Sequence, residues 1–339
     1  MEEIKTVNEL MAHLEELKHN LTGAKPAVDV TEEQKKAKAA YNSAFWEHMY
    51  SGIPANTLRD GGDTAKGFLV PDTYEDKLTE TLRAANFLRS IGTVLNTTQD
   101  LHIPVVMKNG DAQWIGETER YCDANIEFGE IVLEAHKLGT MTLLSEELLA
   151  DSGIDLEAYI AQEYKERIAV SEEEAFLVGD GIGKPLGLVH QAEVGTTTEQ
   201  SGKISMDDMI DLVHSVKQAY RCPDSAVFVM SEDAYHELRK TRYFDGRYIW
   251  NPKFKDDGYD TLFGHRVFVS NYMSEIVPGS KPVLFGDFSY FWIGDRGKRN
   301  IKRLNEAYAK FGQVGFLLSE RVDSKLVLKD AVKALKVAE

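Results

Sequence analysis

The chain has 339 residues, 43% hydrophobic and 28% charged, which is the composition of a globular protein and excludes low-complexity and wholly disordered classes. Its 39 Lys and Arg against 55 Asp and Glu give a formal net charge of −16, which disfavours tight binding to a phosphate backbone. Two cysteines, Cys122 and Cys222, are too few for a disulfide framework. Since no apolar run approaches the ~20 residues of a membrane span and the start lacks a signal-peptide pattern, we expect a soluble protein made inside the cell, without a membrane partner.

A heptad pattern marks the first segment. Val7, Leu10, Leu14, Leu17 and Leu21 recur at steps of three and four residues, as on one face of a helix. The pattern fits a helix packed on its own domain and, equally, a short coiled coil that joins copies of the chain. On the second interpretation Leu10, Leu14 and Leu17 are assembly candidates.

A second helical stretch follows. It begins near Thr31, which can act as N-cap, and ends at Gly52-Ile-Pro54. Residues 52–67 are rich in Gly, Asp and Thr without periodicity, which indicates an extended arm. Residues 72–88 then suit a helix.

The next segment predicts a projecting hairpin. Residues 101–107 and 111–115 have the pattern of two strands around Lys108-Asn109-Gly110. A longer strand-like stretch, 126–143, changes phase at Gly129, as at a bulge. The polar stretch 116–125 between them cannot bury much surface on itself, so we expect the hairpin to find a partner surface.

A long helix is predicted over residues 154–178, capped by Asp151 or Ser152 and ended by Gly179. At 1.5 Å per residue it would span roughly 40 Å, long enough to act as a spine. The glycine-rich stretch 179–187 lacks the order of a nucleotide-binding loop. We interpret it as a helix end with two tight turns, with Gly179, Gly181 and Gly183 as structural turn residues and the first two at positive φ.

After residue 191 the pattern becomes alternating α and β. We predict a helix over 206–220, buried strands at 226–230, 265–270 and 283–286, and a helix from the Ser231 cap to about Lys240. Residues 241–263 form an aromatic, Gly- and Asp-rich excursion. There Tyr248 and Trp250 are candidates for contacts between subunits, although packing within their own domain is an equal expectation for any one ring.

Signatures of catalysis are missing from the sequence. It contains no HExxH pair and no G-x-S-x-G elbow, and we interpret the carboxylate doublets and the run Glu172–Glu174 as solvated faces. Cys122 lies among residues that offset one another's charge and is expected to be an unreactive surface thiol. We therefore predict no catalytic, cofactor-binding or metal-binding residue, and no enzyme.

Several segments, in order, give a resemblance. The chain resembles the major capsid protein of tailed bacteriophages of the Hong Kong 97 type over about residues 40–339. The markers are Gly67-Phe-Leu-Val-Pro71, Leu148-Leu-Ala-Asp-Ser152 before Leu156-Glu-Ala-Tyr-Ile160, the run 172–187, Phe285-Gly-Asp-Phe-Ser-Tyr290 and Arg321-Val-Asp-Ser-Lys-Leu-Val327.

The resemblance implies an α+β fold with named parts. These are an N-terminal arm, a long hairpin called the E-loop, a P domain with the spine helix, and an A domain. We expect a short scaffold-like helical leader at 1–51, the arm at 52–71, a helix and connection at 72–98, the E-loop at 99–138, the P domain at 139–190, the A domain at 191–314, and C-terminal strands returning to the P domain at 315–339.

The resemblance also implies a function without a cofactor. Copies of the chain would form pentamers and hexamers of an icosahedral head around double-stranded DNA, located in the virion and assembled in the bacterial host cytoplasm. Expected partners are the chain itself, a portal, scaffold, protease or decoration proteins, and packaged DNA without sequence preference. Trp114 and Tyr121 in the hairpin are further assembly candidates. The alternatives are an encapsulin-like bacterial compartment shell and, from another class, an α/β enzyme.

Some relatives join subunits through an isopeptide bond between an E-loop lysine and an asparagine, assisted by a glutamate. Here the hairpin tip, 114–128, contains no lysine. Matching the C-terminal motif places Ser319 at the glutamate position and Gly312 at the asparagine position, although a slip of one residue would bring in Glu320. We therefore expect a shell without covalent cross-links.

Overall fold

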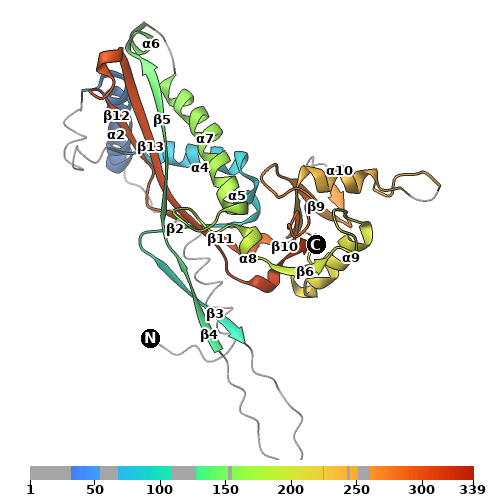
Figure 1. Ribbon diagram of the computed structural model, residues 1–339. Helices are drawn as coiled ribbons and strands as arrows, with labels where there is room; N and C mark the ends of the chain where they lie inside the picture. The colour runs from blue at the N-terminus through green and yellow to red at the C-terminus, as the bar shows by residue number, and fades with distance from the viewer. Residues whose placement is uncertain are drawn as a thin grey trace, which may run out of the picture.

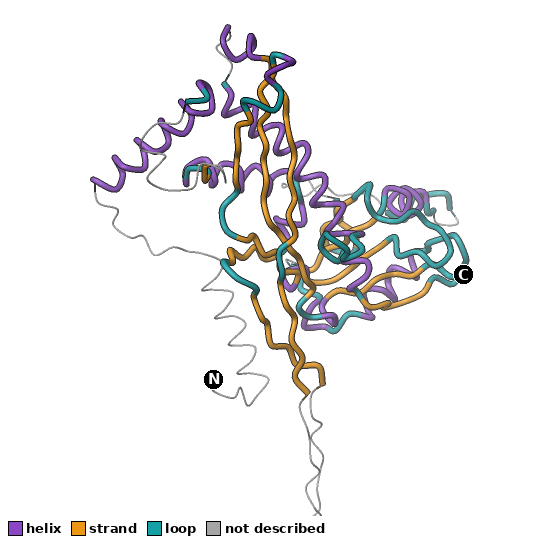
Figure 2. Tube along the Cα trace, turned by 60° about the vertical axis from the view of Figure 1, so that its left-hand side comes forward, coloured by secondary structure: helices purple, strands orange, loops and turns teal. Residues whose placement is uncertain are grey.

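Among the residues that the structure describes, the strands form two six-stranded sheets and one two-stranded hairpin (Figure 1). The computed structural model describes residues 32–53, 68–108, 127–151, 155–223, 225–242, 245–250 and 260–339. One sheet is long and flanked by the longest helix, the other is short and lies to one side, and the hairpin projects away from both (Figures 1 and 2). Within the described residues, no helix has the length and apolar character needed to cross a membrane.

The long sheet is built around one strand, β13 (Gln313–Leu326). On one side β13 pairs antiparallel with β5 from Gln313↔Ser145 to Val322↔His136. Alternate β13 residues such as Phe316 and Leu318 are buried in the core below the helices. The sheet order is β1-β12-β13-β11-β2 with β5 added on β13, and the remaining strands are β1 (Phe68–Leu69), β2 (Thr93–Thr97), β5 (His136–Ser145), β11 (Phe291–Arg296) and β12 (Asn300–Leu304).

The spine helix α7 (Leu156–Val178) has 23 residues and is therefore about 35 Å long. Its buried row, Leu156, Ile160, Tyr164 and Ile168, has the predicted i, i+4 spacing. The N-cap is Asp155, whose carboxylate accepts a hydrogen bond from Ala158 N. The prediction of Asp151 or Ser152 as cap was wrong, because several polar residues precede this helix and the pattern could not choose among them.

The loop after α7 differs from the prediction at one glycine. Gly179 has φ −56°, so the expected positive φ is wrong there. A glycine is required at position 179 because a side chain has no room there. A Cβ would lie 2.2 Å from Pro185 O and 2.4 Å from Ala175 O. Gly181 and Gly183 have φ of 79° and 70°, the left-handed region that glycine adopts without strain.

Three further helices accompany the long sheet: α2 (Glu32–Ser51), α4 (Asp72–Ala85) and α5 (Phe87–Ile91). The predicted single helix 72–88 is divided at Asn86, whose side chain accepts from Leu88 N and caps α5. Helix α2 ends at Gly52 as predicted, where φ is 77°. A short helix, α6 (Glu146–Asp151), follows β5 at the far end of the sheet.

The short sheet has the order β6-β14-β10-β7-β9-β8. Its central strands β7 and β10 are buried at every position, as their continuous apolar runs predicted. The predicted helix 206–220 ends earlier, at Ser215, before a 3-10 turn at Gln218–Tyr220. The elements are α8 (Leu188–Gln191), β6 (Glu193–Thr197), α9 (Met206–Ser215), β7 (Ala226–Met230), α10 (Glu232–Lys240), β8 (Thr261–Leu262), β9 (His265–Val269), β10 (Val283–Asp287) and β14 (Val332–Lys336).

The projecting hairpin pairs β3 (Leu101–Lys108) with β4 (Glu127–Leu133). The predicted strand 111–115 lies outside the described residues. The register shift lies between Val106 and Lys108 instead of at Gly129. The continuous strand 126–143 is also divided, since β4 ends at Leu133 and β5 begins at His136. Strand alternation identifies a strand but fixes neither its register nor its ends, which explains these differences.

The two sheets do not follow the boundaries expected from the sequence. Strands β11 and β12 fall within the range 191–314 but belong to the long sheet, and β14 falls within 315–339 but belongs to the short sheet. The chain therefore crosses between the sheets twice after β10, because β10 and β14 pair with each other and β11 pairs with β13.

Candidate functional site: a buried ionic cluster and the assembly elements

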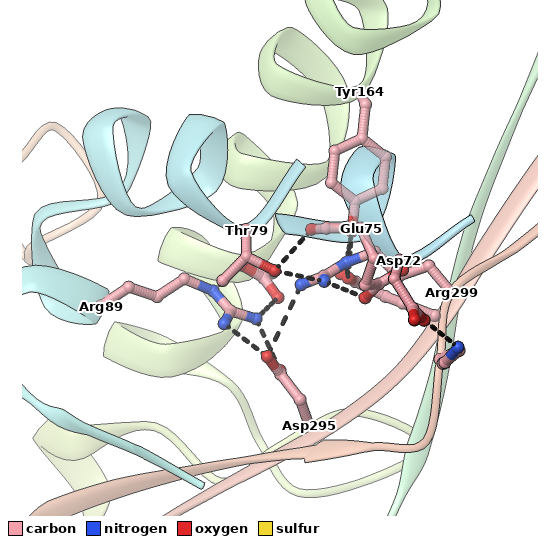
Figure 3. Close-up of polar contacts among 10 residues, drawn as sticks. Asp72, Glu75, Thr79, Arg89, Tyr164, Asp295 and Arg299 are labelled. Atoms are coloured by element: carbon pink, nitrogen blue, oxygen red, sulfur yellow. Dashed lines mark hydrogen bonds and ion pairs between the residues drawn. The ribbon is translucent and has the colours of Figure 1, made fainter. Parts of the chain in front are cut away.

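Within the described residues, no group of three or more His, Cys, Asp or Glu side chains is placed to hold a metal ion. The prominent polar feature is a buried ionic cluster between the helices and the long sheet (Figure 3). It comes from α4, α5, α7, β11, β13 and the turn before β12. Its members are two arginines, Arg89 and Arg299, four carboxylates, Glu75, Glu172, Asp295 and Glu320, and Tyr164.

Arg89 holds one half of the cluster. Its Nε and Nη2 donate to Glu172 at 2.8 and 2.5 Å, and its Nη1 and Nη2 donate to Asp295 at 3.0 and 2.9 Å. The side chain of Arg89 is 1% exposed, so these two-fold contacts form away from water. One guanidinium thereby connects α5, the spine helix and β11.

Arg299 holds the other half. Its Nε donates to Glu320 at 3.0 Å and to the Tyr164 hydroxyl at 2.6 Å, and its Nη1 donates to Glu75 at 2.6 Å. Tyr164 in turn donates its hydroxyl proton to Glu320. Because burial raises the pKa of Tyr164, this hydroxyl keeps its proton. Arg299 therefore connects α4, the spine helix and β13.

The cluster contains more acidic than basic groups. Burial, with Glu320 adding repulsion, raises the pKa of Glu172 to about 8 despite the contact with Arg89. Burial likewise raises the pKa of Glu75. For Asp295 the effect of burial is outweighed by the two guanidinium groups, and its pKa is lowered. The cluster thus holds helices and strands together, and its Glu172 carboxyl group keeps a proton near neutral pH.

At the edge of the cluster, the Asp72 carboxylate on α4 forms ion pairs with two lysines. Hydrogen bonds from Lys298 and Lys38 lower the pKa of Asp72 to about 2. The Lys38 Nζ lies 2.9 Å from an Asp72 oxygen, and Lys298 contacts the other oxygen. Asp72 therefore links α2 and the turn before β12 to the first turn of α4.

The interpretation of the run Glu172–Glu174 as a solvated face was wrong for its first two residues. Glu172 is buried in the cluster, and Glu173 accepts a hydrogen bond from Ser270 Oγ at 2.6 Å. Glu174 alone of the three is exposed. The sequence signal that could have identified Glu172 is its place on the buried i, i+4 face, four residues after Ile168.

The two aromatic assembly candidates in the short-sheet region have different environments. Tyr248 is exposed, with its ring 4.2 Å from the Arg242 guanidinium. Trp250 is 6% exposed, donates from Nε1 to Thr261 O at 2.9 Å, and packs edge-on against Tyr235. Trp250 thus packs within its own domain, which is the second of the two alternatives expected for these rings, while the Tyr248 side chain is exposed. The candidates Leu10, Leu14, Leu17, Trp114 and Tyr121 lie outside the described residues.

The two positions matched to the cross-linking residues, Ser319 and Gly312, carry no carboxyl group, and the neighbouring Glu320 is buried. Ser319 lies on β13 between Gly139 and Asn300, and Gly312 is a left-handed turn residue with φ 62°. Glu320, reached by a slip of one residue, is 5% exposed and has one oxygen bound by Tyr164 and Arg299.

Comparison with known proteins identifies relatives. The phage capsid family matches residues 66–337. The chain is 28% identical over 245 residues to the major capsid protein of Halomonas phage phiHAP-1. The aligned region covers 70% of this chain and 38% of that protein. Over 152 residues it is 28% identical to the major capsid protein of Escherichia phage T5, 42% of this chain and 33% of that one. The chain thus spans well under half the length of these curated relatives.

Solved structures give a fuller overlap. The capsid of a native GTA particle, computed with C5 symmetry, superposes with a TM-score of 0.64 at 27% identity and covers 74% of this chain and 90% of that one. A chain from Gordonia phage Cozz superposes with a TM-score of 0.55 at 15% identity, covering 75% and 87% respectively, which supports the fold alone.

Proposed function

Because this chain belongs to the phage capsid family, we propose that it is the major capsid protein whose copies assemble as pentamers and hexamers into an icosahedral head around double-stranded DNA. The observation that carries the proposal is the fold itself. It is the Hong Kong 97-type capsid fold, which covers 90% of the GTA capsid chain at a TM-score of 0.64. That capsid was computed with C5 symmetry, which supports rings of five for the present chain as well.

The named parts of the family map onto the described elements. We assign the long sheet and α7 to the P domain, the short sheet with α9 and α10 to the A domain, and the β3–β4 hairpin to the E-loop. Residues 52–71 would be the arm and 1–51 the leader. The hairpin supports this assignment, because strands β3 and β4 extend beyond both sheets and a two-stranded hairpin gains stability from a neighbouring surface (Figure 1).

Family membership implies a structural role. Residues such as Arg89 and Arg299 support this role because their buried ion pairs join helices to strands. We expect the particle to be held without covalent cross-links, with portal, scaffold, protease or decoration proteins as further partners. The net charge of −16 favours weak contact with packaged DNA, so that DNA can slide along the inner wall. The encapsulin-like alternative is less favoured, since the family matched and the solved neighbours named here are of phage type or come from a GTA particle.

Electron microscopy of the purified full chain tests the proposal. Closed shells or rings of five and six subunits are expected, and particles from a lysed host should contain nuclease-resistant double-stranded DNA. Denatured particles should run as one band, near 38.1 kDa or lower after removal of a leader. A dispersed monomer, or shells filled with a protein cargo in place of DNA, would contradict the proposed function.

A further inference from the structure

Helices α9 and α10 lie on the side of the short sheet that is turned away from the spine helix (Figure 1). Met209 and Leu212 of α9 share one buried core with Ala234 and Leu238 of α10. Because these side chains hold both helices on the sheet, the opposite face of each helix is turned to solvent, and the two solvent faces cannot meet within one chain. A match between these faces is therefore a match between two copies.

The solvent face of α9 presents an apolar side chain between two carboxylates. Asp207, Ile210 and Asp211 lie within one helical turn on that face, and Ile210 is 41% exposed. Among the residues that the structure describes, neither carboxylate forms an ion pair. We call these three residues the acidic face. Since α9 packs on β6 and β14, the acidic face lies at the β6 end of the short sheet.

The other end of the short sheet carries an open pocket of about 420 Å³ beside α10. Its wall is aromatic, because Tyr235 packs edge-on against Trp250 and the exposed Tyr248 ring forms the outer side. The Trp250 indole donates to the carbonyl of Thr261 on β8, which places this pocket at the β8 end of the sheet. We call it the α10 pocket.

Two cations beside the α10 pocket have no compensating charge within the described part of the chain. Arg239 lies 3.5 Å from the Asp260 carboxylate and is compensated. Lys240 is exposed, and the Arg242 guanidinium lies over the Tyr248 ring at 4.2 Å, but neither forms an ion pair there. The pocket thus offers two free cations beside an aromatic wall.

The acidic face has the complementary composition, with two free carboxylates beside an aliphatic side chain. Contacts between subunits combine an aromatic and apolar centre with opposite charges at the rim in this way. A phosphate chain is a poorer occupant of the α10 pocket, because Glu232 also lines it and Asp260 lies against Arg239.

We propose that the α10 pocket receives the acidic face of a second copy, with Ile210 against the aromatic wall and the two carboxylates beside Lys240 and Arg242. Because the two surfaces lie at opposite ends of one sheet, the contact is head-to-tail, and a head-to-tail contact repeated around an axis closes a ring. The inference rests on the proposed function and deepens it, since it states which surfaces join neighbouring subunits in the short-sheet region.

A substitution in the acidic face tests the contact. Ile210→Asp places a third carboxylate against the aromatic wall, and the yield of rings and shells should fall about tenfold or more. The thermal midpoint of the unassembled chain should not change, because Ile210 is already exposed in one subunit. Val277→Asp is the matched control, since Val277 is 52% exposed and belongs to neither surface. Electron microscopy and sedimentation velocity of the full chain measure the yield.

A charge swap tests whether the two surfaces meet each other. The variants D207K/D211K and K240E/R242E each bring like charges together and should lower the yield of rings and shells. The chain with all four changes should recover that yield, because opposite charges face one another again. A role of either surface by itself would not be rescued by changes in the other.

An Ile210→Asp yield equal to that of Val277→Asp would overturn the contact and leave the proposed function intact. A fourfold variant that assembles no better than the two double variants would overturn the contact in the same way. A wild-type chain that forms neither rings nor shells would contradict the proposed function and, with it, this contact.

Discussion

The long-sheet region and the short-sheet region are stabilised by different interactions. In the short sheet, β7 and β10 are buried at every position, and polar groups such as Ser231 and Asp208 serve as helix caps. In the long-sheet region, Arg89 and Arg299 hold helices and strands together through buried ion pairs. The stability of the short-sheet region therefore depends on buried apolar volume. The stability of the long-sheet region depends also on buried charges, and through them on pH.

The largest loss of stability is expected when one arginine is removed from the long-sheet region. Arg89→Met leaves Glu172 buried without its guanidinium partner and Asp295 with Arg299 alone, and we expect a loss of about 3–5 kcal/mol in the free energy of unfolding. Denaturant unfolding measures it, with Arg83→Met on the exposed face of α4 as matched control, for which we expect a change below about 0.5 kcal/mol. Equal effects of the two variants would show that the ion pairs do not hold the helices and strands together.

A cavity in the short sheet provides the opposite test. Leu284 on β10 is fully buried, and Leu284→Ala should cost about 3 kcal/mol by lost burial and an unfilled cavity. Because no charge is involved, the loss should be the same at pH 5 and pH 8. Val194→Ala on the exposed face of β6 is the control. A loss for Leu284→Ala that varied with pH would contradict the distinction between the regions.

The pH dependence of stability should follow Glu172. Its pKa is raised from 4.5 to about 8, so between these values the folded protein holds a proton that the unfolded chain has released. The free energy of unfolding therefore falls as pH rises through this window, by at most about 1.4 kcal/mol per pH unit for one proton. Denaturant unfolding from pH 5 to pH 8.5 measures the slope.

Two variants sharpen that measurement. Glu172→Gln cannot release a proton and should flatten the slope, while Glu174→Gln, exposed on the same helix, should leave the slope unchanged. A slope that persists in Glu172→Gln would assign the proton to Glu75 or Glu173, whose pKa values burial also raises.

The smallest effect is expected at the turn that joins the two regions. Gly181 has φ 79°, where an L side chain is strained, so Gly181→Ala should cost about 1 kcal/mol. Added ATP should not shift the thermal midpoint, because we interpret this loop as a structural turn. Either a stabilising Gly181→Ala or a midpoint raised by ATP would contradict this role.

Local features were readable from the sequence. The buried strand Ala226–Met230 and its following cap Ser231 lie where the apolar run and the capping rule placed them. The spine helix was identified by its i, i+4 row, and the end of α2 by Gly52. These signals depend on residues within a few positions of one another, so the chain itself determines them. The ordered set of short motifs also pointed to the capsid family.

Tertiary structure decided which distant segments meet. Strand β3 pairs with β4, and alternation could not choose this partner because it is the same for any partner strand. Glu172 is buried because Arg89, 83 residues away, offers it a guanidinium. Trp250 can lie in the core because the backbone carbonyl of Thr261 accepts a hydrogen bond from its indole Nε1. Burial of a charge or an amphipathic ring is favourable only when a specific distant partner compensates its desolvation, and that compensation is a property of the folded chain.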